Sequence, residues 1–525
     1  MADELNIPTH RWYQKRNHVA LAKEDVSRQY IYDSGIQKID AWINSQPWGD
    51  VYIVNRLSPN LVFDFDESYF RTEGTATDLV SAATHTRATS ATYVDANGIL
   101  QTAAINEPRV GHHIWNGSAW VDEGYLHESE ARTNLLLNSD TLATQSVTVT
   151  AVPHTLHFTG TGTVTLTGAS TAGPLVGTGT GEQNRVSLTF TPTAGTLVVT
   201  VTGTVTNADL EVGSTLSSHK PTAGATVTRA ADAMTIPAAN LPWPEPVVIG
   251  PELVTDTFTD ASEGTGSASE SGGSITVYGP DNDNQGIGTL ELASTLEVGK
   301  TYLLSVTIES NSNEVGVACA DTSFAGVNTN GFIREDAGAT GEFTAVVYSK
   351  GNENCVIVYT LTDTTATVGN ISVRELSPAR VSIQMEGTMT YANSNTAFEL
   401  TWLRWVKNSF NYILQRLSTS SPGTGEVVFI QRTSGTPQKT VSSAIDAYTP
   451  GINVPFNTAS RHGSTFINGA VDGTALTADL TPAPLPDLSS SDMQIGFVFN
   501  GTIKLFRVWA DDLTDEGISE ASSNA

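Results

Sequence analysis

The chain has 525 residues, and 27 Lys and Arg face 55 Asp and Glu, so its formal net charge is −28. Nucleic-acid phosphates repel a chain this acidic, which excludes a nucleic-acid partner. Its two cysteines, Cys319 and Cys355, are too few for a disulfide framework or a zinc site. No apolar run approaches the roughly 18 residues of a membrane-spanning helix, so we expect no membrane insertion.

The first segment, residues 1–57, differs from the rest in charge and in pattern. It holds seven basic and seven acidic residues, so the remainder carries the whole net charge. Val19, Ala22, Val26 and Tyr30 recur at helical spacing, which predicts a helix. The segment lacks the apolar region of a secretory signal. We therefore expect a short helical anchor that docks on its own chain or on another subunit.

From Val51 onward the pattern is that of β-strands. Short Val, Thr, Ile and Phe runs alternate with polar residues and are separated by Gly, Pro, Asn and Asp. Residues 133–236 contain 27 Thr, a residue that suits a half-exposed sheet. Asn-Gly pairs predict hairpin turns, and they begin at Asn97, Asn116, Asn330, Asn468 and Asn500. The sequence predicts a mainly β protein of serial antiparallel β-sandwich (jelly-roll) modules behind the helical anchor.

Clusters of Pro and changes of charge predict the module boundaries. Between a Pro-rich hinge and Ser377-Pro378, the chain has 18 acidic and only four basic residues, which indicates a separate acidic sandwich. The hinge carries Trp243, which can pack on a neighbouring module. We expect an anchor at residues 1–57, a β-rich segment at 58–140 that forms part of a lectin-like sandwich, and a Thr-rich β module at 141–236. A hinge follows at residues 237–250, then the acidic sandwich at 251–376 and a last sandwich at 377–525.

Two stretches resemble one pattern that is common in bacteriophage tail-fibre and related virion proteins. The first runs from His85 to Ser139 and contains the segments TYVDANG, NEPRV and EARTNLL. The second, SSHKPTAGATVTRAAD, runs from Ser217 to Asp232. It departs from the pattern at His219 and Lys220, where the family has an aromatic and an apolar residue. The matching positions of the first stretch are Arg87, Ala88, Ser90, Ala91, Thr92, Tyr93, Gly98, Asn106, Pro108, Arg109, Arg132, Thr133 and Asn134.

The last two modules resemble sugar-binding folds. The segment GSTFINGAVDG, from Gly463 to Gly473, and the stretch from Met493 to Ile518 resemble a laminin G or concanavalin A-like lectin domain. The acidic module resembles a carbohydrate-binding-module sandwich through LEVGKTYLLSVTI and GNISVREL. These resemblances imply a fold more than a function, because such sandwiches serve many purposes.

Four tryptophans are candidates for stacking on sugar rings: Trp115, Trp120, Trp402 and Trp405. Trp115 and Trp120 flank an Asn-Gly pair, so a hairpin can bring them together. Aromatic residues more often serve packing, and both interpretations stay open.

No catalytic residue is expected. Asp64 and Asp66 alternate as in a strand, which places them roughly 6.6 Å apart and leaves a capsule-degrading glycosidase as an alternative. Asp281 and Asp283 are weak candidates for a calcium loop, and the pattern favours a plain acidic turn over a calcium site. We expect no other cofactor.

The resemblance implies a virion structural protein rather than an enzyme: a tail-fibre or spike subunit, assembled in the bacterial cytoplasm and displayed on the phage particle. Residues 1–57 would contact other virion proteins, and the sandwiches would bind host-surface glycan. We expect a homo-oligomer, with a trimer as the first hypothesis. A head-attached spike or decoration protein is the alternative within the same class.

Overall fold

The computed structural model describes residues 59–73, 75–244, 247–281, 283–321, 331–360, 363–393, 399–433, 436–482 and 484–523. The predicted helical anchor, residues 1–57, lies outside them. The chain forms two compact units: unit 1 comprises Met1–Pro244 and Arg380–Ala525, and unit 2 comprises Glu245–Ala379. Among the described residues every strand pair is antiparallel, and no helix is long and apolar enough to cross a membrane.

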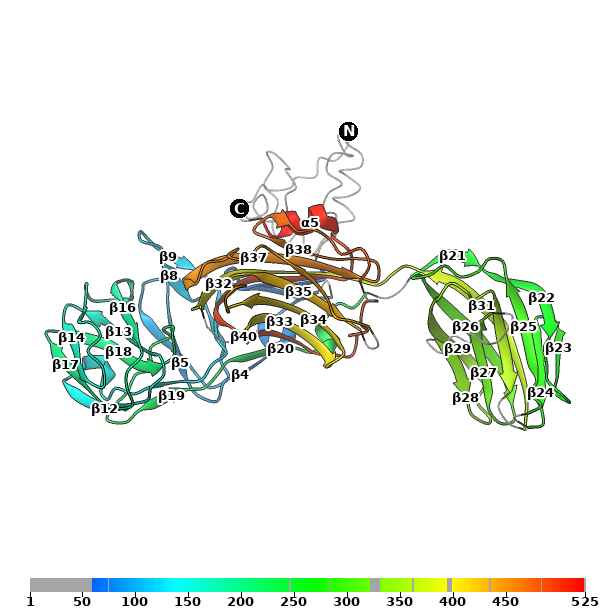
Figure 1. Ribbon diagram of the computed structural model, residues 1–525, viewed down its shortest axis with the longest axis horizontal. Coiled ribbons are helices and arrows are strands. Elements are labelled where there is room, and N and C mark those ends of the chain that lie inside the picture. Colours follow the sequence, from blue (N-terminus) through cyan, green and yellow to red (C-terminus); the bar gives the residue numbers. More distant parts are fainter. Residues whose placement is uncertain are drawn as a thin grey trace, which may run out of the picture. The chain divides into compact units, whose positions relative to one another are not determined.

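Unit 1 contains a large sandwich of two sheets (Figure 1). The ten-stranded sheet consists of β3 (Thr75–Thr77), β2 (Tyr69–Thr72), β1 (Leu61–Asp64), β41 (Asn500–Trp509), β32 (Arg380–Tyr391), β37 (Gly451–Gly463), β38 (Ile467–Val471) and β39 (Thr474–Ala475). In addition, β10 (Tyr125–Glu128) pairs with β41, and β7 (Arg109–Val110) pairs with β10. The seven-stranded sheet consists of β36 (Lys439–Ser442), β35 (Val427–Arg432), β34 (Asn411–Ser418), β33 (Glu399–Asn408), β40 (Met493–Val498), β20 (Ala233–Ile236) and β4 (Thr84–Thr86).

Two distant parts of the chain build this sandwich together. Phe63 of β1 lies opposite Phe506 of β41, and β10 pairs with the beginning of β41. The boundaries that separate residues 58–140 from residues 377–525 therefore divide one folding module. Two of the predicted Asn-Gly turns lie inside strands, because Asn468 belongs to β38 and Asn500 begins β41.

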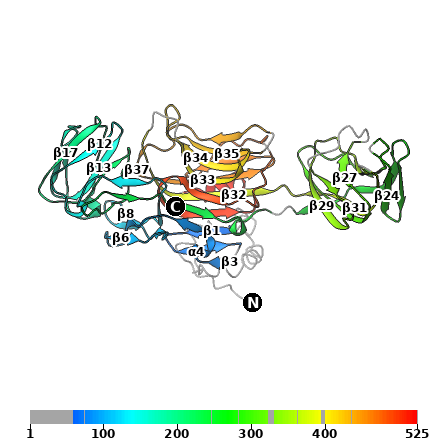
Figure 2. The same cartoon turned by 90° about the horizontal axis from the view of Figure 1, so that it is seen from below.

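Short elements complete the sandwich (Figure 2). Helix α5 (Thr514–Ala521) contacts β37 and β38, and its Ile518 belongs to one apolar cluster with Ala459 of β37 and Trp509 of β41. The connecting segments form two small hairpins, β5 (Ala91–Val94) with β6 (Leu100–Ala103) and β8 (His113–Trp115) with β9 (Trp120–Asp122). They also form the short helical turns α4 (Leu79–Ala82), η2 (Ser139–Thr141) and η4 (Ala238–Asn240).

The Thr-rich segment forms a smaller sandwich within unit 1, as its alternation predicts. One sheet holds β12 (Gln145–Val149), β17 (Gly195–Thr202), β14 (Thr163–Gly168) and β15 (Leu175–Val176). The other holds β16 (Val186–Phe190), β13 (His154–Gly160) and β18 (Val205–Val212), and η3 (Glu182–Asn184) precedes β16. On β14 and β17 the Thr side chains point outward, whereas Thr155 and Thr159 of β13 are buried. The inward positions, such as Leu156, Leu197 and Val199, form the core. The pair β11 (Arg132–Asn134) and β19 (Val227–Arg229) leads into and out of this module.

Unit 2 is a separate two-sheet sandwich with its own apolar core. Its first sheet holds β23 (Ser267–Ser271), β24 (Ser274–Gly279), β31 (Thr364–Leu376), β26 (Thr301–Asn311) and β29 (Gly341–Tyr348), with β21 (Val248–Glu252) on β31. Its second sheet holds β22 (Val254–Asp260), β25 (Ile287–Leu292), β30 (Cys355–Thr360), β27 (Val315–Ala320) and β28 (Phe332–Glu335).

The Pro-rich hinge is divided between the two units. Its first part belongs to unit 1, where the Trp243 ring lies edge-on to Trp405 at 5.2 Å between centroids. Its last residues, from Val248, already belong to β21 of unit 2. The predicted packing of Trp243 on a neighbouring module is thus confirmed, and the boundary between the units falls at Pro244 and Glu245.

Candidate functional site

Two tryptophans face each other across a short hairpin, as the sequence predicts. Trp115 of β8 lies opposite Trp120 of β9, and their ring centroids are 5.5 Å apart with the planes tilted by 59°. The Oδ1 atom of Asn116 accepts a hydrogen bond of 2.9 Å from the backbone N–H of Ala119, which closes the turn. Gly117 has a φ of 97°, where side chains are strained. The Asn-Gly pair therefore fixes the two indoles side by side.

The two indoles are not equally open. Trp120 is half-buried, because Gly98 in the neighbouring β5–β6 turn lies directly against its ring. A Cβ atom at Gly98 would come within 2.5 Å of that ring, so only glycine fits. Trp115 is 36% exposed. Trp120 thus anchors the hairpin, and Trp115 presents its ring to solvent.

The hairpin borders a pocket of about 290 Å³, close to the lower end of the range for ligand pockets. Its walls come from separate segments: the two hairpins, η3 with the residues after it, the loop after β18, and strands β32, β37 and β41 of the ten-stranded sheet. The apolar part includes Leu100 and Ile452. Polar groups in the lining include Tyr93, Glu182, Gln183, Arg185, Asn453 and Asn500.

Several of these polar groups can bind hydroxyls. Within the described part of the chain, the buried Oδ1 atom of Asn500 has no hydrogen-bond partner, and it can accept one from a ligand. Arg185 donates to Glu182 through Nε at 2.8 Å, so this pair offers both a donor and an acceptor without net charge. Burial, together with the guanidinium of Arg109, lowers the pKa of His112 to about 3, so this imidazole is neutral. The pocket is therefore polar and nearly uncharged.

An ionic cluster, here called the junction network, lies under the pocket and consists of Arg87, Arg109, Glu128, Arg229 and Asp232. The Arg109 side chain is 0% exposed and bridges Glu128 at 2.6 Å and Asp232 at 2.5 Å. Arg87 lies 2.9 Å from Asp232, and Arg229 lies 3.2 Å from Glu128. Burial alone would raise the pKa of Glu128, but the guanidinium groups of Arg229 and Arg109 hold it well below its usual range.

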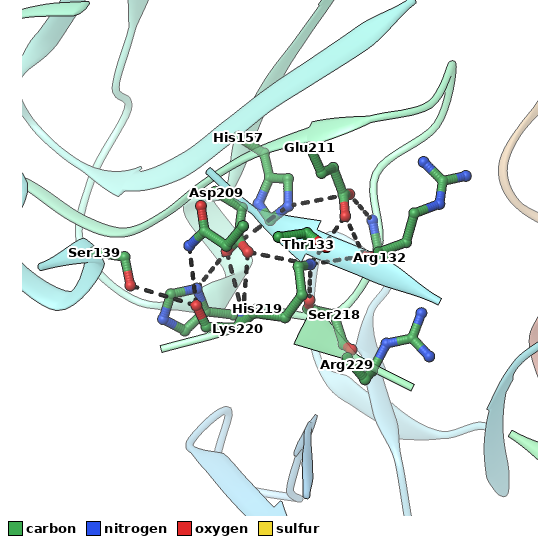
Figure 3. Close-up of polar contacts among 12 residues, drawn as sticks. Arg132, Thr133, Ser139, His157, Asp209, Glu211, Ser218, His219, Lys220 and Arg229 are labelled. Carbon is green, nitrogen blue, oxygen red and sulfur yellow. Dashed lines mark hydrogen bonds and ion pairs between the residues drawn. The ribbon is translucent and has the colours of Figure 1, made fainter. Parts of the chain in front are cut away.

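A second ionic cluster fills the Thr-rich module (Figure 3). The Nζ atom of Lys220 lies 3.1 Å from Asp209 and 2.9 Å from Glu211. His157 lies opposite Asp209 in the β13–β18 register, and His219 contacts Asp209 from the other side. All five side chains are buried. His219 and Lys220 are the positions that depart from the virion pattern, and both contact carboxylates on β18.

The motif that resembles virion proteins is thus a structural scaffold. Four of its charged members, Arg87, Arg109, Arg229 and Asp232, meet in the junction network, although up to 145 residues separate them. Asn134 of the same motif is buried and donates to Ala208 and Lys220 carbonyls, both at 2.9 Å. A buried charge is tolerated only when an opposite charge pairs with it, so each of these residues depends on the others. They tie the two sandwiches of unit 1 together below the pocket.

Trp402 and Trp405 are not available to a sugar, which corrects their selection as glycan candidates. Both are 0% exposed. The Trp402 ring stacks on Phe456 of the facing sheet at 5.2 Å, and its Nε1 donates to Gln415. Trp405 donates to the Ser491 carbonyl at 2.8 Å. These residues form the core between the two large sheets.

The structure places the candidate carboxylates at the end of β1 and in a turn of unit 2. β1 ends at Asp64, which is 0% exposed, and Asp66 follows in a turn, 3.7 Å from Lys504. The Oδ1 atom of Asp281 accepts from the backbone N–H of Asp283 at 2.9 Å, as in an acidic turn. The described residues include no group of three or more His, Cys, Asp or Glu that could hold a metal ion. Calcium at Asp281 and Asp283 remains a prediction.

Comparison with known proteins gives no family. No protein-family model matches the chain, and no curated protein matches it. Among solved structures, the chain is similar to a CBM40 module of a Ruminococcus gnavus IT-sialidase bound to α2,3-sialyllactose, with 14% identity over 28% of this chain and 83% of that chain, at a TM-score of 0.22.

Two further matches cover more of the chain. The binding domain of botulinum neurotoxin serotype G has 9% identity over 50% of this chain and 45% of that chain, at a TM-score of 0.19. Domains LG4-5 of the mouse laminin α1 chain have 13% identity over 46% of this chain and 89% of that chain, at a TM-score of 0.19. Similarity this low supports no conclusion about this chain. Its β-sandwich fold is assigned from the strand pairing in its own sheets.

The sequence identified the tryptophan hairpin but missed the other walls of the pocket. Glu182 and Arg185 follow a Thr-rich turn and carry no motif. Asn453 lies near the beginning of β37, and Asn500 stands in an Asn-Gly pair that suggested a turn. No local signal marks these residues, because only the fold brings them to the hairpin.

Proposed function

We propose that this chain is a non-enzymatic structural protein of a bacteriophage virion, a tail-fibre or spike subunit that displays β-sandwich modules and binds host-surface glycan. The motif from Arg87 to Asp232 supports the virion assignment by resemblance. In this proposal residues 1–57 attach the chain to other virion proteins. The chain acts as a homo-oligomer, with three copies as the first hypothesis, because several weak sites on one particle gain from avidity.

The open Trp115 ring at the mouth of the pocket supports glycan binding most strongly. The C–H face of a sugar ring packs on an indole face, while its hydroxyls need hydrogen-bond partners at the rim. Trp115 is held in place by its contact with Trp120, so little side-chain freedom is lost on binding. The free Oδ1 of Asn500 and the Glu182–Arg185 pair supply the partners. Because this lining has little net charge, we propose that the pocket prefers neutral sugars.

A glycan array probed with the purified full chain tests this proposal. We expect binding to at least one neutral host-surface glycan. Trp115→Ala should weaken that binding by about 10-fold to 30-fold, since loss of one aromatic contact is worth about 1.5–2 kcal/mol. Tyr278→Ala is the matched control, because Tyr278 is 41% exposed but lies in unit 2. Absence of glycan binding, or equal losses in the two variants, would contradict the proposal.

A further inference from the structure

The outer face of the seven-stranded sheet carries a row of side chains that the core does not use. Residues opposite each other in the register point to the same side of a sheet. Gln494, Arg404 and Leu414 form such a row across β40, β33 and β34. The alternate row contains Trp405, which is buried between the sheets. The Arg404 row therefore faces away from the core.

This outer face is basic and aromatic, although the chain as a whole is acidic. The Arg404 guanidinium lies 4.3 Å above the ring centre of Phe497, and the Arg432 guanidinium lies 5.0 Å from that of Phe410. Phe497 is 43% exposed and Phe410 is 52% exposed. Tyr412 lies opposite Arg432 in the register and contacts the same guanidinium. Such cation–aromatic pairs hold the guanidinium groups in place, and Nη1 of Arg432 also donates a hydrogen bond of 3.3 Å to the Ser409 carbonyl.

The charges on this face are not balanced. Residues 377–525 hold nine Lys and Arg, and four of them lie on β33, β34 and β35: Arg404, Lys407, Arg416 and Arg432. Arg416 is paired with Glu399, and Lys407 lies 3.2 Å from Asp487. Arg404 and Arg432 form no ion pair with any residue that the structure describes. The buried Nε atom of Arg432 also has no hydrogen-bond partner there.

A groove of about 1080 Å³ runs over this face. Arg404, Lys407 and Tyr412 line it, and so do polar groups of Asn408, Ser490 and Gln494. Arg432 lies outside this lining and contacts the ring of Tyr412, which belongs to it. Asp492 is the acidic residue in the lining, and it already accepts a hydrogen bond of 2.9 Å from the Ala238 N–H. From the strand spacing and the rise per residue, the Cα atoms of Arg404 and Arg432 are about 12 Å apart. A ligand that neutralises both must therefore carry anionic groups at intervals.

We propose that this groove is a second binding site, separate from the tryptophan pocket, for an acidic polysaccharide that carries carboxylates on its sugar rings. A guanidinium binds a carboxylate through two parallel hydrogen bonds. The Tyr412 ring in the lining supplies a face for a sugar, and Gln494 and Asn408 supply partners for hydroxyls. The net acidity of the chain disfavours long, densely charged polyanions such as nucleic acids. Acidic sugars at this groove and neutral sugars at the pocket would give the chain two independent contacts with one cell surface.

Titration calorimetry of the full chain with a hexamer of galacturonic acid tests this second site. We expect binding that weakens with added salt, and an affinity at least 10-fold lower for the double variant Arg404→Gln with Arg432→Gln. The matched control is Arg334→Gln with Arg374→Gln, which removes the same charge from unit 2 and should change the affinity less than twofold. Trp115→Ala should bind the hexamer like the wild type, so failure of the pocket and failure of the groove are distinguishable.

Three outcomes would overturn the proposal. One is absence of binding to the hexamer by the wild-type chain. Another is an equal loss of affinity in the two double variants. The third is equally tight binding of a neutral galactose hexamer or of single-stranded DNA, which would show that the groove does not select carboxylate-bearing sugars. Circular dichroism of each variant verifies that the fold is intact.

Discussion

The junction network and the tryptophan hairpin are neighbours in unit 1 and use their side chains in opposite ways. In the junction network each arginine is buried against a carboxylate, and the members come from segments far apart in the chain. The hairpin is local, and its Trp115 has an open face. The difference teaches that the motif that resembles virion proteins forms a scaffold. In the proposed function, recognition depends on a short exposed element that rests on this scaffold.

Removal of one charge from the junction network should have the largest effect on stability. Asp232→Asn leaves the buried Arg87 and Arg109 without their shared carboxylate, which we expect to cost about 3–5 kcal/mol of unfolding free energy. Urea unfolding followed by tryptophan fluorescence measures this loss. All nine tryptophans lie outside residues 245–379, so the signal does not come from unit 2.

Glu399→Gln provides the control for this prediction. Glu399 is half-exposed and pairs with Arg416 at the surface, so its loss should cost at most about 1 kcal/mol. If Asp232→Asn were no more destabilising than Glu399→Gln, the junction network would not be the scaffold of unit 1.

Acid should weaken the scaffold in two stages. Burial lowers the pKa of His127 to about 4, below the value of about 6.5 in an unfolded chain. The unfolded state therefore binds more protons as the pH falls below about 6.5, and stability begins to decrease. Against the effect of burial, Arg229 and Arg109 lower the pKa of Glu128, and Arg109 lowers that of Asp232. Their contribution is complete above about pH 4.3 and is lost as the pH falls below it.

Unfolding free energies measured between pH 3 and pH 8 check this prediction. The wild type should become steadily less stable from about pH 6.5 downward, with a steeper decline below about pH 4.3. Asp232→Asn should show a shallower decline in the acidic range, because one of the two carboxylates is already absent. A wild-type stability that is constant or rises on acidification would contradict the described charge pairing.

Much of the fold was predictable because its signals are local. Alternating Thr and apolar residues specify the strands of the small sandwich, and the Asn116-Gly117 pair specifies the tryptophan hairpin. The joining of β1 to β41 was not predictable, because pairing across more than 400 residues leaves no local pattern. For that reason one sandwich looked like two modules in the sequence.

The roles of individual residues were harder to predict for a geometric reason. Strand alternation shows which residues share a face, but it does not show which face is buried. At Trp402 a β-bulge changes the alternation, so that Trp402 and Trp405 both point into the core. The arginines of the junction network resembled surface residues, since a charged side chain is almost never buried unless its partners converge in space.

The central claim is that the residues that bind glycan differ from the residues that stabilise the fold. Trp115→Ala, which has the smallest predicted change in stability, tests this claim most directly. Affinity for the array-selected glycan and urea unfolding should be measured on the same preparation of Trp115→Ala. Because Trp115 is partly exposed, the unfolding free energy should stay within about 0.5 kcal/mol of the wild type. The affinity should fall at least 10-fold. An unchanged affinity, or a loss of affinity matched by a loss of several kcal/mol in stability, would contradict the account.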